Sequence, residues 1–372
     1  MREVAAVFLK LGMTAFGGPA AAIGLMQDEV VERRQWVDRQ RFLDLLGATN
    51  LIPGPNSTEL AIHLGYVRAG WPGLIVGGVG FILPAMLMVM ALAWVYVRFG
   101  TLPQAEWLLY GVKPVILAIV AHALWQLVRT ALKDWVTGVA GAAVLVGALL
   151  GLGEVPLLFG IALTVMVVKN RSALYGAAPV WLLGFEAAPA VAAAVGGGPT
   201  LGALGLFFLK VGSVLYGSGY VLLAFLQGDL VERWGWLTSR QLLDAVAVGQ
   251  FTPGPLFTTA TFVGYLVAGW AGAVVATVAI FLPGFFFVAV SGPLLPRLRQ
   301  SPWMAGFLDG ANAASLGLMA AVTLALGRAS MADWRAVLLG LAAMGVLLRF
   351  RKLNSAWLVL AGAVLGWLIK GM

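Results

Sequence analysis

Cysteine is absent from the 372 residues, histidine occurs twice, and charged residues make up only 11% of the chain. A chain without thiols can form no disulfide, thiolate metal site or cysteine nucleophile. Hydrophobic residues account for 61% of the sequence. This composition excludes an ordinary soluble domain, because surface-to-volume scaling leaves most residues of such a domain near water. We therefore expect a polytopic membrane protein in contact with the lipid bilayer.

Enzyme signatures are absent as well. The chain has no H-E-x-x-H, G-x-x-x-x-G-K-[ST] or G-x-S-x-G pattern, which argues against a metalloprotease, a nucleotide-driven pump and a serine hydrolase. We expect neither an enzyme nor a bound cofactor or metal. The net charge of +8 is assigned to orientation in the membrane rather than to nucleic acid. The first apolar stretch, from Val4 to Met26, lacks a cleavage signal, so we expect it in the mature fold.

The two halves of the chain are repeats of one another. Phe8-Leu9-Lys10 recurs as Phe208-Leu209-Lys210, and Pro53-Gly54-Pro55 recurs as Pro253-Gly254-Pro255. Further matches are Val31-Glu32-Arg33 with Val231-Glu232-Arg233, Gly70-Trp71 with Gly269-Trp270, Leu83-Pro84 with Leu282-Pro283, and Asp134-Trp135 with Asp333-Trp334. Chance alignment of two apolar segments would match Leu, Ala and Val instead. We therefore infer a duplication.

The apolar segments predict the helices. In half one they lie at 3–27, 42–69, 71–97, 105–130, 135–151 and 154–168; half two repeats them, and 178–196 has no counterpart. A membrane span takes about 20 apolar residues, so 71–97 and 105–130 qualify and the last two are short. The runs Phe16-Gly17-Gly18-Pro19 and Pro53-Gly54-Pro55 interrupt the first two segments, because proline removes a backbone donor and glycine frees the backbone.

We predict an all-α polytopic membrane protein made of two inverted-topology repeats with discontinuous, re-entrant helices. The first repeat covers 1–171, a linker transmembrane helix covers 172–200, and the second repeat covers 201–372. Basic residues favour the inversion and a cytoplasmic N-terminus. Half two has Arg297 and Arg299 where half one has only Arg98, and its loop with Arg349, Arg351 and Lys352 matches the uncharged residues 150–153. A parallel arrangement fits the total of basic residues nearly as well, but not this exchange.

The Pro-Gly-Pro breaks are the first candidate for a binding site. Asn56 is placed to cap the helix that follows, and Glu59 to complete a capping box with it. A helix start presents free N–H groups that suit an anion, and transporters often bind substrate at discontinuous helices. The alternative is a pair of proline kinks packed by their neighbours. The candidate substrate-binding residues are Gly17, Gly18, Asn50, Pro53, Gly54, Pro55, Asn56, Ser57, Thr58, Gly217, Ser218, Gln250, Pro253, Gly254, Pro255, Thr258 and Thr259.

Ionisable residues inside apolar runs are the second candidate. Lys10 and Lys210 each precede a glycine break, and a lysine at the bilayer centre costs roughly 2.5–3.5 kcal/mol on insertion scales. We expect them to face an anion, unless they snorkel to the interface. Lys113 is a further candidate for substrate binding. Glu59 and His63 follow the first break and are candidates for proton coupling, or else a helix cap and an interfacial histidine.

These motifs resemble the chromate ion transporter (CHR) family over nearly the whole chain, in its two-repeat, long-chain form. The resemblance rests on Phe16-Gly17-Gly18-Pro19, the run from Asn50 to Glu59, Gly65-Tyr66-x-x-Ala69-Gly70-Trp71, Phe81-Ile82-Leu83-Pro84, and the runs from Leu215 to Tyr220 and from Val248 to Pro255. It implies antiparallel halves and efflux of chromate across the cell membrane, driven by the proton motive force and conferring chromate resistance. Ala22 stands where family members often have a histidine, so no role passes to that position.

Chromate is a tetrahedral dianion, which backbone N–H groups, hydroxyls and lysines can bind. Sulfate has nearly the same size and charge, and nothing in the sequence separates the two ions. A transporter of sulfate or another oxyanion therefore stays an alternative, and a gated anion channel on the same scaffold is the rival from another class. Protons are the expected coupling ion, and a homodimer is an assembly that the sequence leaves open.

Overall fold

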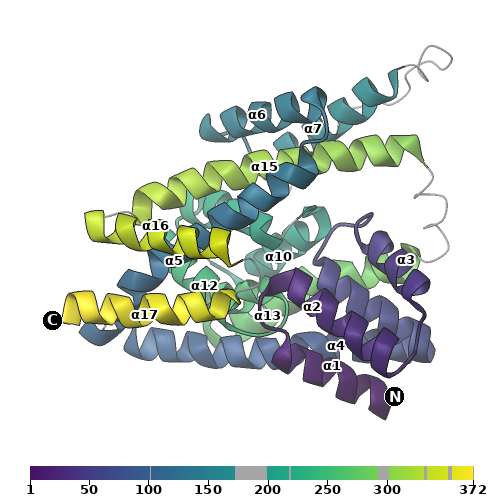
Figure 1. The fold of residues 1–372 in the computed structure, drawn as a ribbon, viewed down its shortest axis with the longest axis horizontal. Helices are drawn as coiled ribbons and strands as arrows, with labels where there is room; N and C mark the ends of the chain where they lie inside the picture. The colour runs from purple at the N-terminus through teal and green to yellow at the C-terminus, as the bar shows by residue number, and fades with distance from the viewer. Residues whose placement is uncertain are drawn as a thin grey trace.

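The fold is seen in a computed structural model that describes residues 1–100, 102–171, 199–217, 219–291, 301–330, 333–350 and 354–371 (Figure 1). These residues form helices and no strand. Half one contains α1 (Arg2–Thr14), α2 (Gly18–Gln27), η1 (Asp28–Arg33), α3 (Arg39–Thr49), α4 (Asn56–Phe99), α5 (Pro103–Ala131), α6 (Trp135–Leu149) and α7 (Glu154–Lys169). Half two contains α10 (Leu201–Val214), η2 (Gly219–Val221), α11 (Leu222–Phe225), η3 (Leu226–Arg233), α12 (Ser239–Phe251), η4 (Leu256–Thr258), α13 (Thr259–Ser291), α15 (Pro302–Ser330), α16 (Trp334–Arg349) and α17 (Ser355–Gly371). The predicted linker helix, apart from residues 199–200, lies outside the described residues, as do Arg297, Arg299, Arg351 and Lys352.

The two longest helices, α4 and α13, each turn back on themselves. Ala69 and Gly70 leave helical geometry in α4, where Gly70 has a φ of 63°, and Gly269 has a φ of 60° at the same place in α13. Glycine adopts such a positive φ without the steric cost of a Cβ. The two arms of α4 pack closely, since a Cβ on Gly65 would lie 2.2 Å from the carbonyl oxygen of Gly73. Each of these helices is therefore a short arm followed by a long span.

The long spans expose apolar side chains at helical spacing. In α4 these are Trp71, Ile75, Val79, Leu83 and Leu87, and in α13 they are the equivalent Trp270, Val274, Val278, Leu282 and Phe286. Such a stripe on an outer face is typical of contact with lipid or a partner. By length and composition α4, α5, α13 and α15 each contain a segment able to cross a membrane. The predicted spans at 71–97 and 105–130 are confirmed, as is an all-α membrane fold built from two repeats.

The two halves exchange helices. Helix α5 of half one packs against α16 and α17 of half two, and α15 packs against α6 and α7, as Figure 1 shows for α15. Glycines allow close approach. A Cβ on Gly111 would lie 1.9 Å from the carbonyl oxygen of Gly362, and a Cβ on the equivalent Gly310 would lie 2.7 Å from Cα of Ala162. The halves are therefore interlocked, and the limits 1–171 and 201–372 as domains stay predictions.

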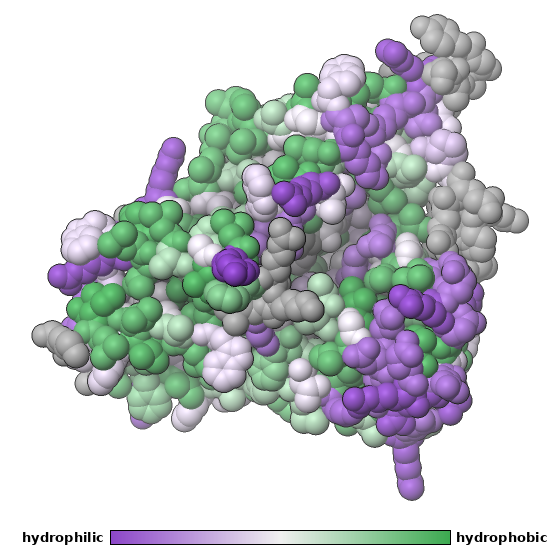
Figure 2. All heavy atoms as spheres, in the orientation of Figure 1, coloured by the Kyte–Doolittle hydropathy of each residue, from purple (hydrophilic) through white to green (hydrophobic). Residues whose placement is uncertain are grey.

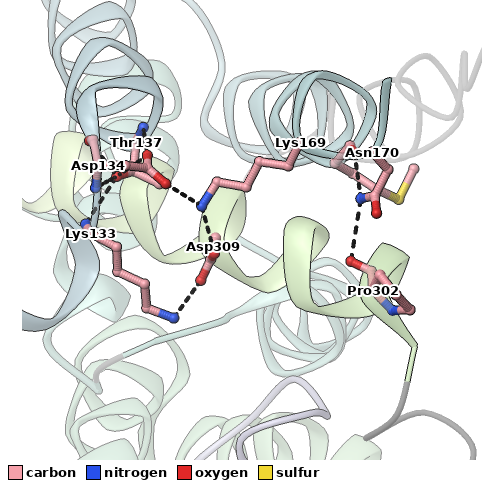
Figure 3. Close-up of polar contacts among 8 residues, drawn as sticks. Lys133, Asp134, Thr137, Lys169, Asn170, Pro302 and Asp309 are labelled. Atoms are coloured by element: carbon pink, nitrogen blue, oxygen red, sulfur yellow. Dashed lines mark hydrogen bonds and ion pairs between the residues drawn. The ribbon is translucent and has the colours of Figure 1, made fainter. Parts of the chain in front are cut away.

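A cluster of four charged residues, here called the ionic cluster, joins the interlocked helices (Figure 3). Lys169 on α7 lies 2.7 Å from Asp309 on α15 and 2.7 Å from Asp134, the N-cap of α6. Lys133 reaches the other oxygen of Asp309 at 2.6 Å. Asp134 also accepts from the backbone N–H of Thr137 in a capping box. The cluster thus ties the start of α6 to α7 and to the opposite half.

Hydrophilic residues gather at one end of the molecule. Figure 2 shows them over the N-terminal elements at the lower right, whereas hydrophobic residues cover much of the rest of this face. A hydrophilic end beside a hydrophobic surface suits a helical membrane protein, whose two parts face water and lipid. The orientation of each half relative to the membrane stays a prediction.

Candidate functional site

The helix breaks of the two halves are bonded crosswise. The backbone N–H of Gly54 donates to the carbonyl oxygen of Leu215 at 2.9 Å, and the N–H of Gly254 donates to the carbonyl oxygen of Ala15 at 3.0 Å. Ala15 and Leu215 are equivalent residues, each just before the glycine break of its own half. The fold therefore brings each Pro-Gly-Pro break against the glycine break of the opposite half.

Both Pro-Gly-Pro breaks are tightly packed. A Cβ on Gly254 would lie 2.6 Å from Cβ of Ala85, and a Cβ on Gly54 would lie 2.3 Å from Oε1 of Glu59. Both glycines also have a positive φ, 134° at Gly54 and 98° at Gly254. All three residues of each break are buried. An ion from solution therefore reaches the breaks only after the surrounding helices rearrange.

The helix after the first break begins differently from the prediction. Helix α4 starts at Asn56, its N-cap is Pro55, and no side chain caps it. The Asn56 amide instead donates to Oδ1 of Asn50 at 2.6 Å, and neither carboxyl oxygen of Glu59 has a hydrogen-bond partner in the described part of the chain. The predicted capping box is wrong, because the fixed φ of proline lets the helix begin one residue earlier. The N–H groups of Thr58 and Glu59 both donate to the carbonyl oxygen of Pro55. The first two N–H groups of α4 lack acceptors within the helix, so the start remains suited to an anion.

The second break has fewer free hydrogen-bond donors for a ligand than the first. The one-turn helix η4 precedes α13, with Pro255 as its N-cap. Thr258 donates its hydroxyl to the carbonyl oxygen of Pro255 at 2.8 Å, and Thr259 donates to that of Leu256 at 2.8 Å. Both hydroxyl protons are thus committed to the backbone. The two breaks share a backbone path but differ in their free donors.

Buried polar atoms without a partner collect around the breaks. Within the described residues they include Oγ1 of Thr58, both carboxyl oxygens of Glu59, Nε2 of His63 and Nε2 of Gln250. Glu59 is fully buried and His63 is 5% exposed. The other side of the Gln250 amide accepts a hydrogen bond from Ser355 on α17 at 3.4 Å. Because most buried polar groups in proteins are paired, this cluster marks a place where a ligand, a proton or water completes the bonding.

Lys10 and Lys210 are engaged by carboxylates. The Nζ of Lys10 lies 3.1 Å from Oε2 of Glu29, and the Nζ of Lys210 lies 2.5 Å from Oδ2 of Asp229. The two pairs are equivalent, since each acid follows its lysine by 19 residues. An arginine a few residues further along also contacts each carboxylate. In this conformation an oxyanion must therefore compete with an internal carboxylate for either lysine.

Lys113 and its repeat equivalent Asn312 have different surroundings. The Nζ of Lys113 on α5 lies 3.8 Å from Oδ1 of Asp244 on α12, and Tyr96 donates to Oδ2 of Asp244 at 2.9 Å. Asn312 instead lies beside a glycine break, where a Cβ on Gly217 would be 3.6 Å from its Oδ1. Lys113 thus has a carboxylate partner, and the Asn312 amide faces the break.

The remaining candidates lie at different depths. Ser57 and Thr58 are buried in the first turn of α4, Asn50, Gly17 and Gly217 are exposed, and Gly18 is intermediate; Ser218 lies outside the described residues. The candidates at the Pro-Gly-Pro breaks are therefore buried, apart from Asn50 and the half-buried Asn56, and those described at the glycine breaks are more exposed.

Sequence reasoning missed several neighbours of the site. Glu29 and Asp229 carried a readable signal, an acid at the same distance after each lysine. Asn354, whose side chain lies 3.8 Å from where a Cβ on Gly17 would be, carried none, because it precedes a helix far along the chain. Among the described residues no three His, Asp or Glu side chains group closely enough to hold a metal ion.

The chain matches known proteins over almost its whole length. The sequence model described as Chromate transporter matches residues 2–169 and again 202–367, once in each half. The chromate transport protein of Cupriavidus metallidurans is 36% identical, over 98% of this chain and 92% of the relative. The probable chromate transport protein of Synechococcus elongatus is 34% identical over 92% and 89%, and the chromate transport protein of Pseudomonas aeruginosa 32% over 99% and 92%. No solved structure matches the chain. A two-repeat helical membrane fold and matches over nearly the full length agree: the chain belongs to the chromate transporter family and is a transport protein rather than an enzyme.

Proposed function

We propose that this chain is a secondary active transporter that exports chromate, or a tetrahedral oxyanion of the same charge, across the cytoplasmic membrane. The observation that carries the proposal is the crosswise pairing of the breaks, which brings helix starts and unpartnered buried polar atoms together. Free N–H groups at a helix start favour an anion. Relatives named for chromate transport, matched over nearly their full length, support chromate as the substrate.

The oxyanion would be held by the first N–H groups of α4, the hydroxyl of Thr58 and the amide of Gln250. A helix start supplies only about half an elementary charge, so two starts leave a dianion short by about one charge. Lys10 or Lys210 would supply it after leaving its carboxylate partner. Because the breaks are buried, the site must open to one side of the membrane at a time, as alternating access requires.

The membrane potential supports export as the direction. Moving one elementary charge across 100 mV is worth about 2.3 kcal/mol, so a dianion leaving an interior-negative cell gains about twice that amount. Export would lower cytoplasmic chromate and confer resistance. Everted membrane vesicles that contain the protein should accumulate chromate when energised and lose it on addition of an uncoupler. Accumulation only in right-side-out vesicles would reverse the proposed direction.

A gated anion channel on the same scaffold is the alternative class. A transporter in proteoliposomes should show saturable chromate flux and no unitary currents, whereas a channel would conduct in planar bilayers. Single-channel conductance would overturn the transporter. Excess sulfate serves as the selectivity test, because it blocks chromate flux only if the site accepts both ions.

Inverted halves with the N-terminus in the cytoplasm are part of the same proposal. The chain is free of thiols, so single cysteines can be introduced without background. Gln40 and Ser239 are near-equivalent positions at the starts of α3 and α12. Cysteines there should react with an impermeant thiol reagent from opposite sides of the membrane. Labelling of both from the same side would refute the inversion.

A further inference from the structure

The two Pro-Gly-Pro breaks are alike in backbone and differ in one ionisable group. Against Gly54 the space is filled by the carboxyl group of Glu59, whose Oε1 would lie 2.3 Å from an added Cβ. Against Gly254 the equivalent space is filled by the methyl group of Ala85. The residue equivalent to Glu59 is Thr259, which donates its hydroxyl to the backbone. Half one therefore has a carboxyl group where half two has a methyl group and a committed hydroxyl.

The opposite half leaves room for this carboxyl group. Gly284 on α13 is the repeat equivalent of Ala85, and it has no side chain to approach the first break. A Cβ on Gly284 would lie 3.7 Å from Cγ and 3.8 Å from Oε1 of Glu59. The Glu59 side chain thus lies between the break of its own half and a helix of the other half.

In the part of the chain that the structure describes, no charged group pairs with Glu59. It is fully buried, and neither oxygen has a hydrogen-bond partner among the described residues. The titratable groups that face it are Tyr216, within electrostatic range at the opposing glycine break, and His63, one helical turn further along α4. No lysine, arginine or histidine of the described residues donates a hydrogen bond to Glu59. Burying an unpaired carboxylate costs several kcal/mol, so the closed conformation holds Glu59 as a neutral acid.

We infer that Glu59 is the proton-carrying group of the transport cycle. It takes up a proton from water on the outside, crosses the closed, substrate-free state protonated, and releases the proton to water when the breaks open to the cytoplasm, so that one proton enters as one oxyanion leaves. One proton moves per cycle, because the second break offers no equivalent ionisable group. The inference rests on the proposed function and adds the residue and the stoichiometry of coupling. Glu59 need not contact the oxyanion to fulfil this role.

The test separates exchange from net coupled transport in proteoliposomes. Glu59→Gln keeps the shape of the neutral acid but cannot release a proton. We expect chromate–chromate exchange within about twofold of the parent and at least a tenfold loss of accumulation driven by an imposed pH gradient. Glu59→Asp, which keeps a carboxyl group, should retain both activities. Glu106→Gln is the matched control, because Glu106 is an exposed carboxylate paired with Arg240 at 3.0 Å, and it should change neither.

Three results with variants, and one with the parent protein, would overturn the inference. Accumulation driven by the pH gradient that survives in Glu59→Gln excludes Glu59 as the carrier. Loss of exchange in both Glu59→Gln and Glu59→Asp shows a structural role instead. The exchange-only phenotype in His63→Gln, with Glu59→Gln unchanged, assigns the proton to His63. A parent protein without saturable chromate flux refutes the proposed function as well, whereas saturable flux that ignores the pH gradient refutes this inference alone.

Discussion

The two halves share their scaffold and differ where a substrate or a proton would touch them. Both have the crosswise backbone bond, the lysine–carboxylate pair and the hairpin turn of the long helix. They differ at the first turn after the break, Glu59 against Thr259, and on the packing helices, Lys113 against Asn312. Matching features satisfy backbone geometry and burial, which constrain both copies in the same way. The differences give a nearly symmetric molecule two distinguishable faces, which directional transport needs.

The largest difference in stability between equivalent variants of the two halves is expected when the carboxylate of each lysine–carboxylate pair is removed. Asp229 is fully buried, and the side chain of its partner Lys210 is 23% exposed; for Glu29 and Lys10 the values are 8% and 51%. Removing one member of a buried ion pair costs about 3–5 kcal/mol. We expect Asp229→Asn to lower the free energy of unfolding by about that amount and Glu29→Gln by much less, since Lys10 can turn to water. Thermal unfolding in detergent measures both, and equal Tm shifts would contradict the expectation.

The break glycines give the next largest effect. Gly254→Ala meets the rigid Cβ of Ala85 at 2.6 Å, whereas Gly54→Ala meets the movable carboxyl end of Glu59 at 2.3 Å. Overpacking costs about 1–3 kcal/mol, and a positive φ adds about 1–2 kcal/mol for a residue with a Cβ. Gly254→Ala should therefore destabilise more than Gly54→Ala in the same unfolding assay. Adding Ala85→Gly should recover the packing part of the loss, and no recovery would show that the strain lies in the backbone alone.

Much of this architecture could be predicted from the glycine and proline residues that interrupt helices. Gly54, Gly254 and their flanking prolines marked the breaks correctly, and apolar length marked the spans. Hydrophobic periodicity shows that a helix face is buried but not which helix covers it. The sequence therefore could not predict that α6 and α7 pack against α15 of half two, or that α16 and α17 pack against α5 of half one. Gly70 belonged to a recognised motif, yet only the packing of Gly65 on Gly73 shows that it turns the chain back.

The candidate site was predictable in position and less so in detail. The helix breaks lie where the glycines and prolines placed them, and the role of Glu59 stays a proposal. The capping box was not formed, because a proline took the N-cap position. The cost of a lysine in lipid predicted that Lys10 and Lys210 face an anion. In the structure the anions beside them are the carboxylates of Glu29 and Asp229. Glu29 lies in a charged stretch that reads as a surface linker, since sequence shows charge density but not burial. Pairings of this kind depend on the tertiary fold.

Replacing the lysines tests whether they also serve the substrate. Lys10→Met and Lys210→Met each leave the carboxylate with an arginine partner, so the protein should still fold and insert. Chromate binding should weaken at least tenfold, which corresponds to about 1.4 kcal/mol, and more than for Lys→Arg. Equilibrium binding in detergent measures the change. If both methionine variants bind as tightly as the parent, the lysines are structural and the search moves to Lys113.

One pair of equivalent positions on the interlocked helices makes two different kinds of contact, an ion pair in one case and a hydrogen bond from a neutral hydroxyl in the other. Asp309 on α15 and Tyr110 on α5 are repeat equivalents. Each takes part in a contact with an aspartate that caps a helix, Asp134 for Asp309 and Asp333 for Tyr110. Asp309 shares Lys169 with Asp134, whereas Tyr110 donates its hydroxyl directly to Asp333 at 2.6 Å. The contact in the ionic cluster depends on charge at both ends. The tyrosine contact needs charge only on the aspartate.

The smallest expected effect is the response of these two contacts to pH and salt. The hydrogen bond from Lys169, followed by that from the Thr137 backbone, lowers the pKa of Asp134 from 3.8 to about 2, and the Tyr110 hydroxyl lowers the pKa of Asp333. A lowered pKa in the folded state contributes stability above the unfolded value, and that stability is lost as the pH falls from about 3.8 toward 2. Solvent screening limits the share of the partly exposed Asp134 to on the order of 0.5–1 kcal/mol. Salt screens an ion pair more than a hydrogen bond from a neutral hydroxyl. Lys169→Gln should therefore flatten the dependence of Tm on both salt and acid, while Tyr110→Phe should leave the salt dependence as it is. The opposite pattern would mean that the tyrosine contact, and not the ionic cluster, carries the electrostatic part of the link between the halves.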